Sequence, residues 1–385
     1  MNRGLFTNCA ASHALLVLSL MAVPAQSMEC AADAAYEGPE PRTGAEIVFP
    51  SARIDISEAM AEGRAAILDA AFESVLTNTD APAAAMAVWS PVYGYWSQSS
   101  GLDEDAPGSF WWASVGKLVT ATLILELIEE EKLSLDERID RWFPDYPQSA
   151  LITVDDLLLH RSGVFSFQAD EKLGKKRGYK PPAKLLQVSA GHGADFCPGS
   201  NWYYSNTGYL MLGLIVEAIE QEPLSEVVAR RIAEPLGLDS LQLVTKGDPD
   251  ELIVPPHNDP PTRVREIASL HGAGGVIAEP GDMLVFLNAV LTGRLYSSTA
   301  RKSAFADLYP MFGSGMHYGR GVMLIDVLDP DTPTTWLGHV GGSPDSKAVL
   351  IYDAERDTYA ALVLNKAAPG EAVVNVLLKA MDELP

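Results

Sequence analysis

The chain has 385 residues, of which 47% are hydrophobic and 21% charged, so it can bury a large core and is too long for a single minimal domain. Its 51 acidic residues outnumber the 28 lysines and arginines and give a formal charge of −23. This balance argues against a nucleic-acid partner, because a phosphate backbone needs a basic surface. The seven histidines show no metal-ligand spacing such as H-E-x-x-H, and the chain has no glycine-rich phosphate loop, so neither a metal nor an organic cofactor is implied.

The first 27 residues have the pattern of an export signal. Arg3 supplies positive charge, residues 14–23 form an apolar stretch, and Pro24-Ala25-Gln26-Ser27 is typical of a small-residue cleavage region. The apolar stretch is shorter than the roughly 20 residues that span a bilayer, which disfavours the alternative of an uncleaved anchor. We expect cleavage near Ser27 and an exported protein, periplasmic or secreted, with no stable membrane span.

The same expectation determines which of the three cysteines remain in the exported protein. Signal removal would take Cys9 away and leave Cys30 and Cys197 in an oxidising compartment, where a disulfide between them is permitted. Two unpaired thiols are the alternative.

Beyond a loosely ordered lead-in over residues 28–50, the hydrophobic pattern predicts helices and strands in a definite order. Apolar residues at helical spacing predict helices at 57–78, 115–131, 211–219, 281–291 and 371–384. Apolar or aromatic runs predict strands at 84–89, 93–96, 321–327, 348–352 and 359–364. Strands therefore occur at both ends of the chain, and helices interrupted by Pro and Gly occupy the middle. We predict one sheet assembled from both chain ends (51–150 and 271–385) with a helical insertion at 151–270.

The first chemical motif stands where the apolar helix at 115–131 begins. Ser114 and Lys117 are three residues apart, so on a helix their side chains lie on one face within one turn. A serine hydroxyl is a poor nucleophile, but an amine whose pKa is lowered by burial can take its proton. The S-x-x-K pattern is short, and it gains weight from its position at the entrance of a buried helix.

The second motif is Tyr204-Ser205-Asn206, which lies between Pro198-Gly199 and an apolar helix. A phenol on a turn can relay a proton, and a carboxamide can bind a substrate amide through its donor and its acceptor. The alternative is an ordinary turn with a buried tyrosine.

The third motif, His339-Val340-Gly341-Gly342, lies between two strand-like segments. Its glycines would let a substrate approach an edge strand closely, where a backbone N–H could join that of Ser114 in an oxyanion hole. The alternative is a simple glycine-rich turn.

In this order, S-x-x-K, Y-x-N and H-x-G resemble the three motifs of serine β-lactamases, DD-peptidases and related esterases. Five further stretches resemble segments of the same family: 152–163, 234–238, 274–283, 318–321 and 364–365. The likeness extends from about residue 50 to the C-terminus. It implies one hydrolase domain at 51–385 with the β-lactamase/DD-peptidase-like fold, which is an α/β fold with an all-α region and an antiparallel sheet flanked by helices.

The resemblance also implies roles for the site residues. Ser114 would be the acylated nucleophile, and Lys117 and Tyr204 would share the proton transfers, with the base for acylation left open between them. The substrate-binding residues would be Asn206, which holds an amide, His339, which tunes the electrostatics opposite the serine, and the backbone of Gly341 and Gly342. Gly342 would donate an oxyanion N–H together with Ser114. His160 is expected to be a structural residue.

One departure from the family concerns the third motif. Class C β-lactamases carry Lys-Thr-Gly there, whose cation and hydroxyl receive the carboxylate of the β-lactam, whereas this chain has His339 and Val340. Loss of a charge-assisted hydrogen bond costs about 1.5–3 kcal/mol, which argues against efficient β-lactam hydrolysis. Arg320 or Lys347 could supply the missing contact, the alternative for each being a solvated surface cation.

The sequence therefore favours a serine hydrolase that forms an acyl-enzyme on a small-molecule or peptide substrate. A D-alanyl-D-alanine-type peptide or a related amide or ester is the first substrate class. The alternatives are a carboxylesterase of the same family and a catalytically silent relative that binds peptidoglycan fragments or a partner protein. Retention of Ser114, Lys117 and Tyr204 together argues against the silent relative.

Overall fold

The computed structural model describes residues 28–32, 34–102, 108–257, 262–311, 315–328 and 333–384. The predicted export signal at 1–27, Cys9 included, lies outside the described residues. Among the helices that are described, none is both long and apolar enough to cross a bilayer.

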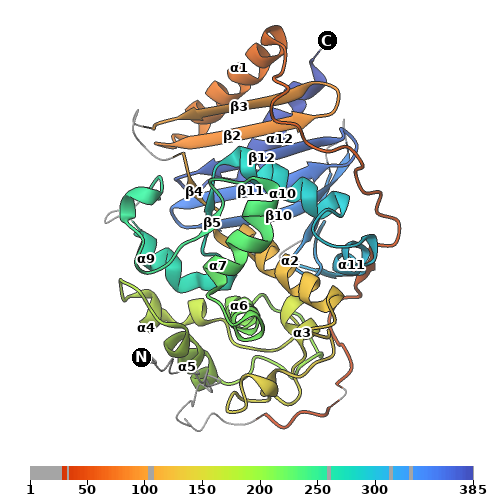
Figure 1. Ribbon diagram of the computed structural model, residues 1–385, viewed down its shortest axis with the longest axis vertical. Helices are drawn as coiled ribbons and strands as arrows, with labels where there is room; N and C mark the ends of the chain where they lie inside the picture. The colour runs from red at the N-terminus through yellow and green to blue at the C-terminus, as the bar shows by residue number, and fades with distance from the viewer. Residues whose placement is uncertain are drawn as a thin grey trace, which may run out of the picture.

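A nine-stranded antiparallel sheet forms the upper half of the molecule in Figure 1, in the order β1-β7-β8-β9-β10-β11-β12-β2-β3. Three strands come from the N-terminal part: β1 (Arg42–Thr43), β2 (Ala84–Ser90) and β3 (Gly94–Ser100). Six come from the C-terminal part: β7 (Asp307–Pro310), β8 (Met316–Tyr318), β9 (Met323–Val327), β10 (Thr334–Ser343), β11 (Ser346–Asp353) and β12 (Thr358–Leu364). The predicted sheet built from both chain ends is thus confirmed.

Both faces of the sheet are covered by helices, which explains why β2, β11 and β12 read as continuous apolar runs. All seven residues of β2 and of β12 are buried. One face packs against the terminal helices α1 (Glu62–Thr79) and α12 (Gly370–Asp382), and the other packs against α10 (Pro280–Thr292) and the central helix α2 (Gly116–Glu129). Twelve of the fourteen residues of α2 are buried, as its apolar sequence predicts.

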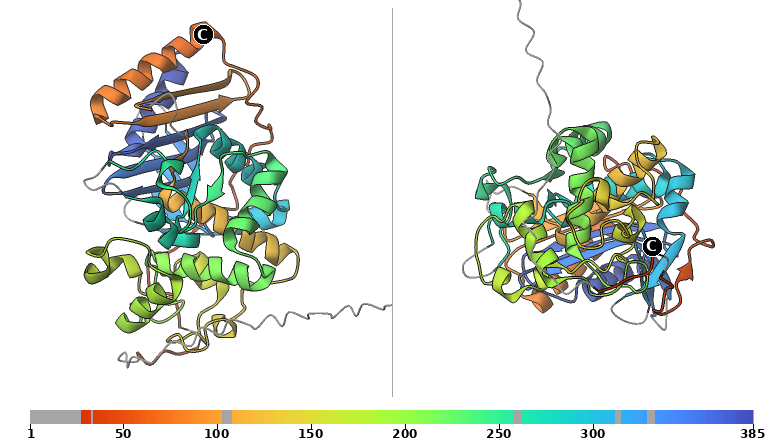
Figure 2. Two further views of the ribbon diagram at one scale, coloured as in Figure 1. Left: turned by 60° about the vertical axis from the view of Figure 1, so that its left-hand side comes forward. Right: turned by 90° about the horizontal axis from the view of Figure 1, so that it is seen from below.

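The helical region lies below the sheet, as both Figure 1 and the left view of Figure 2 show. Its α-helices are α3 (Val154–Leu158), α4 (Glu171–Gly174), α5 (Pro182–His192), α6 (Asn206–Glu220), α7 (Leu224–Val228), α8 (Glu234–Leu236) and α9 (Val264–Ile267), and α11 (Ser298–Ala304) follows α10. The region is not purely helical, because β5 (Gln242–Leu243) pairs with β6 (Val276–Ala278), which also pairs with β4 (Phe110–Trp111). This small sheet links the helical region to the segment that precedes Ser114.

The third motif lies within a strand rather than between two strands, so the alternative of a simple glycine-rich turn is wrong. His339, Gly341 and Gly342 lie within β10, and the turn follows only at residues 344–345. The pairing of β10 with β9 ends at Gly338, whereas its pairing with β11 continues to Ser343. The second half of β10 therefore has an unpaired edge inside a wide sheet, and this edge faces the turn that carries Ser114.

The lead-in at 28–50 is tied to the fold at two points and is less loose than its sequence suggests. Strand β1 pairs with β7, and Cys30 is joined to Cys197 by a disulfide with a Cα–Cα distance of 5.4 Å. Cys197 immediately precedes the Pro198-Gly199 turn that leads to Tyr204. The disulfide thus connects the start of the described chain to the segment carrying the second motif.

We predict that the exported protein has no free thiol when it is denatured without reductant and two after reduction. Closing a loop of 167 residues stabilises the fold by about 5 kcal/mol in the chain-entropy model, so the double variant Cys30→Ser/Cys197→Ser should unfold at a clearly lower temperature. Thiol titration and thermal unfolding measure the two effects. Two free thiols before reduction would reject the bond.

Candidate active site

Ser114 lies on a single helical turn, Ala113–Val115, directly before α2. Two tryptophans fix this turn against β6 and the residues before it. The indole N–H of Trp111 donates to the carbonyl of Gly274 at 2.7 Å, and that of Trp112 donates to the carbonyl of Ala278 at 3.0 Å. The serine is therefore held by the small sheet and by α2 together.

Lys117 is fully buried, and its amine contacts three oxygen atoms. Nζ lies 2.6 Å from Oδ1 of Asn206, 2.6 Å from the carbonyl oxygen of Ala273 and 3.2 Å from Oγ of Ser114. Burial lowers the pKa of Lys117 well below its usual value. A neutral amine has two N–H groups and one lone pair. In the neutral form of this amine the two short contacts would take both N–H groups, which would leave the lone pair for the hydroxyl of Ser114.

Tyr204 lies beside both Ser114 and Lys117. Its ring centroid lies 4.9 Å from Nζ of Lys117. Burial raises the pKa of the Tyr204 phenol, and a hydrogen bond with Ser114 opposes that rise only in part. The phenol is therefore protonated at neutral pH, and the two pKa values are shifted in opposite directions.

His160 holds the backbone on both sides of Tyr204. Its carbonyl oxygen accepts from the N–H of Tyr203 at 3.0 Å, and its Nδ1 accepts from the N–H of Ser205 at 3.1 Å. The imidazole and phenol ring centroids are 4.2 Å apart. Burial lowers the pKa of His160 well below its usual value, so the ring is neutral and Nδ1 is free to accept. This geometry agrees with the structural role expected for His160.

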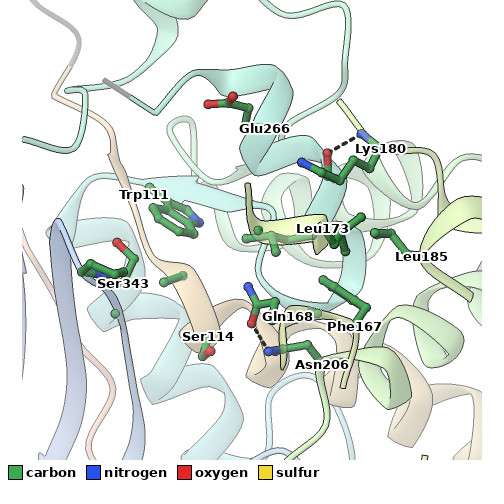
Figure 3. A pocket seen from close by; sticks show the side chains of 17 residues that line it. Trp111, Ser114, Phe167, Gln168, Leu173, Lys180, Leu185, Asn206, Glu266 and Ser343 are labelled. Atoms are coloured by element: carbon green, nitrogen blue, oxygen red, sulfur yellow. Dashed lines mark hydrogen bonds between the residues drawn. The ribbon is translucent and has the colours of Figure 1, made fainter. Parts of the chain in front are cut away.

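Asn206 begins α6, where the Ser205 hydroxyl caps the helix by accepting from the N–H of Gly208. Its Oδ1 accepts from Lys117, and its Nδ2 donates to Oε1 of Gln168. Gln168 also lines the site, and it was not predicted from the sequence. It lies 38 residues before Asn206, in a turn with no recognisable motif. The two carboxamides form one polar wall beside Ser114 (Figure 3).

His339 lies on β10 and is 0% exposed. Its Nδ1 is 2.7 Å from the carbonyl oxygen of Val340, and its Nε2 is 3.2 Å from the hydroxyl of Tyr318. Burial, with a smaller contribution from Lys117, lowers the pKa of His339 to about 3. His339 is therefore neutral and brings no charge to the site.

The glycines of β10 contact the serine turn through their backbone. A Cβ added to Gly341 would lie 2.7 Å from the carbonyl oxygen of Trp112 and 2.8 Å from the nitrogen of Ser114. Gly342 lines the cavity at the adjacent position. The first and third motifs thus meet at the N–H of Ser114.

We predict that Gly341→Ala lowers kcat/KM by about 100-fold, because both close contacts are backbone atoms and the serine turn must shift. Gly247→Ala is the matched control, since the nearest atom to its added Cβ is 3.8 Å away. Steady-state kinetics on one ester substrate compares them. Equal activities in the two variants would contradict the contact.

A cavity of 480 Å³ opens beside Ser114. Figure 3 shows the side chains that surround it. Seventeen residues line it, among which Ser114, Asn206 and Gly342 belong to the predicted site: Trp111, Ala113, Ser114, Phe167, Gln168, Leu173, Gly174, Lys180, Leu185, Asn206, Glu266, Ser269, Leu270, Ala273, Gly342, Ser343 and Pro344.

The two cations considered for carboxylate binding lie elsewhere. Arg320 is 6% exposed, and its Nε donates to Asp155 at 2.5 Å. Nζ of Lys347 forms an ion pair with Glu371 at 2.9 Å. Val340 also points away, because it shares the sheet face of Val349, which packs toward α1 and α12. The third motif thus provides neither a cation nor a hydroxyl to the cavity.

Comparison with known proteins identifies the family to which the chain belongs. The family model described as Beta-lactamase matches residues 68–380, which is most of the chain. The chain belongs to the beta-lactamase family. Penicillin-binding protein 4* of Bacillus subtilis is 25% identical over 289 residues, covering 66% of this chain and 63% of that protein. Esterase EstB of Burkholderia gladioli is 31% identical over 169 residues, covering 40% and 43%.

Solved structures of the family have the same fold. The D-amino acid amidase of Ochrobactrum anthropi SV3 superposes with a TM-score of 0.72 at 25% identity, covering 82% of this chain and 98% of that chain. A penicillin-binding protein of Bacillus halodurans superposes with a TM-score of 0.68 at 19% identity, covering 80% and 98%. In the sequence comparisons, this member of the beta-lactamase family spans 57% and 63% of the length of two penicillin-binding proteins of Bacillus subtilis.

Proposed function

We propose that this protein is a serine hydrolase that forms an acyl-enzyme on Ser114. The observation that carries the proposal is the contact between Ser114 Oγ and Lys117 Nζ, a nitrogen whose pKa is lowered by burial and which makes two shorter hydrogen bonds to Asn206 and Ala273. In the first step, Oγ bonds to the acyl carbon while its proton moves to Nζ. The leaving group then takes a proton and departs, and water releases the acyl group by the reverse path.

The opposite pKa shifts of the two proton carriers support a division of roles between them. Burial lowers the pKa of Lys117 and raises that of Tyr204, so Lys117 is the base for acylation. The protonated phenol of Tyr204 is then the donor to the leaving group, and the proton that Lys117 took from Ser114 passes to Tyr204 and restores the phenol. The N–H groups of Ser114 and Gly342 receive the oxyanion, in keeping with the approach of β10 to the serine turn.

We propose a D-alanyl-D-alanine-type peptide or a related amide or ester as the substrate. The relatives in the comparisons include penicillin-binding proteins, a teichoic acid D-alanine hydrolase, a D-amino acid amidase and an esterase. Paired carboxamides at Asn206 and Gln168 can bind the amide group of such an acyl chain. Efficient β-lactam hydrolysis is disfavoured, because His339 and Val340 replace the Lys-Thr of the third motif.

We also propose that the protein is exported. The sequence of residues 1–27 has the pattern of a signal, and the Cys30–Cys197 disulfide suits an oxidising compartment.

The test is incubation of the purified protein with a fluorescent penicillin, a fluorophosphonate and p-nitrophenyl esters, followed by peptide mapping. We expect fluorophosphonate on the peptide that contains Ser114, turnover of the esters and weak labelling by penicillin. Absence of both labelling and turnover would leave the catalytically silent relative as the better assignment.

A further inference from the structure

The catalytic cavity contains one cation that the mechanism does not use. Lys180 lies in the segment between α4 and α5 and lines the cavity together with Ser114. Figure 3 shows Lys180 and Glu266 across the cavity from the serine, with Leu173 and Gln168 between them. Lys117 is the other lysine of the site, but it is fully buried and is not among the residues that line the cavity.

The backbone of Lys180 is fixed, whereas its ammonium has spare donors. Its N–H donates to Oγ of Ser269 at 2.8 Å. Nζ donates to the carbonyl oxygen of Gly178 at 3.2 Å, which uses one of its three N–H groups. In the described part of the chain no carboxylate lies within ion-pair distance of this nitrogen.

Glu266 is the acidic neighbour, but its charge is already compensated. Its Oε1 accepts from Nε of Arg177 at 2.9 Å and from the N–H of Gly178 at 2.8 Å, and its Oε2 accepts from the N–H of Arg263 at 3.1 Å. The local charges of Arg177, Glu266 and Lys180 therefore leave one net positive charge at the cavity wall. Such a site is unusual in a chain whose formal charge is −23.

The surroundings of Lys180 strengthen a hydrogen bond between its ammonium and an anionic group. Leu173, Leu185 and Leu270 line the same cavity. Burial lowers the pKa of Lys180, with Glu266 opposing and Arg177 adding to the decrease, so the ammonium is partly desolvated. A charge-assisted hydrogen bond in such a setting is stronger than one in open solvent.

We infer that Lys180 binds a carboxylate carried by the acyl part of the substrate, so that the enzyme prefers acyl donors with an anionic end over neutral ones. This inference rests on the proposed acyl-serine chemistry and names its substrate class. The acyl chain would run from Ser114 past Gln168 and Leu173, with its carboxylate on Nζ of Lys180.

The test compares three p-nitrophenyl-type esters on wild type, Lys180→Met and Lys180→Arg. The first is the p-nitrophenyl monoester of adipic acid, the second is neutral p-nitrophenyl hexanoate, and the third is 3-carboxy-4-nitrophenyl hexanoate, with its carboxylate on the leaving group. We expect Lys180→Met to lower kcat/KM for the adipate ester about 10-fold, mainly through KM, and to leave the hexanoate unchanged. Lys180→Arg should retain most of the preference.

Lys184→Met is the matched control, because it removes the same charge only four residues away from Lys180. Lys184 is exposed, and its Nζ contacts Gln187 at 3.0 Å. It should change none of the three efficiencies. Equal losses for adipate and hexanoate esters in Lys180→Met, or a loss confined to the ester with a leaving-group carboxylate, would overturn the inference. Hexanoate turnover by wild type reports the acyl-serine chemistry separately, so a failure of the proposed function is distinguishable from a failure of the Lys180 assignment.

Discussion

Replacing Ser114 by alanine is expected to abolish covalent labelling and to lower kcat by about five decades or more. The serine is the only nucleophile of the proposed mechanism, and the loss of one member of such a unit removes nearly all of its rate enhancement. The fold should persist, because the change deletes one partly exposed hydroxyl and leaves no large cavity. Intact-mass analysis after fluorophosphonate treatment and circular dichroism measure the two effects.

Ser343→Ala is the control for this experiment, because Ser343 lines the same cavity but has its hydroxyl bonded to Asp345 and Ser346. It should keep the label. A labelled Ser114→Ala protein would show that another residue is acylated, and the whole assignment of the site would then fail.

The part of this site that the sequence predicted consists of residues close together in the chain or marked by a family motif. Ser114 and Lys117 are one helical turn apart, so helix geometry alone places them side by side. Tyr204 and Asn206 flank the cap of α6, and the polar-to-apolar change at Ser205 indicates that boundary. The sheet was predictable for a similar reason, since buried strands such as β2 and β12 are continuous apolar runs.

The remainder depends on contacts between distant segments, which local pattern does not specify. The carbonyl of Ala273 and the side chain of Gln168 complete the site from positions 156 residues after Lys117 and 38 residues before Asn206. The unpaired edge of β10 exists because β9 begins only at Met323, opposite Gly338, which depends on the register between strands. Arg320 looked like a surface or substrate-binding cation, but folding buries it against Asp155, which is 165 residues away.

Lys117→Met is expected to lower kcat/KM by about three decades or more, because methionine fills a similar volume and cannot take the proton of Ser114. The hydroxyl remains in place, so slow labelling by fluorophosphonate should persist where turnover is lost. For wild type, kcat/KM should rise with pH through the lowered pKa of Lys117, since the neutral amine is the active form. In Lys117→Met, kcat/KM should not show this rise with pH.

The same residue leaves a signature in stability that does not depend on activity. Because burial lowers the pKa of Lys117 in the folded state, the unfolded chain binds one more proton between that lowered value and the ordinary pKa of a lysine. The free energy of unfolding of wild type should therefore rise with pH in this interval relative to Lys117→Met. Urea unfolding of both proteins at neutral and alkaline pH measures the difference. Parallel stability profiles would mean that Lys117 is charged in the folded protein and is not the base.

Tyr204→Phe completes the argument, because Lys117 and Tyr204 serve one proton path through Ser114. The double variant Lys117→Met/Tyr204→Phe should be only slightly slower than the slower single variant, because either substitution alone already blocks the shared proton transfer. Phenylalanine keeps the ring that packs 4.2 Å from the imidazole of His160, so the turn should hold its shape. Losses that add fully in free energy would instead show that the two residues act in separate steps on separate protons.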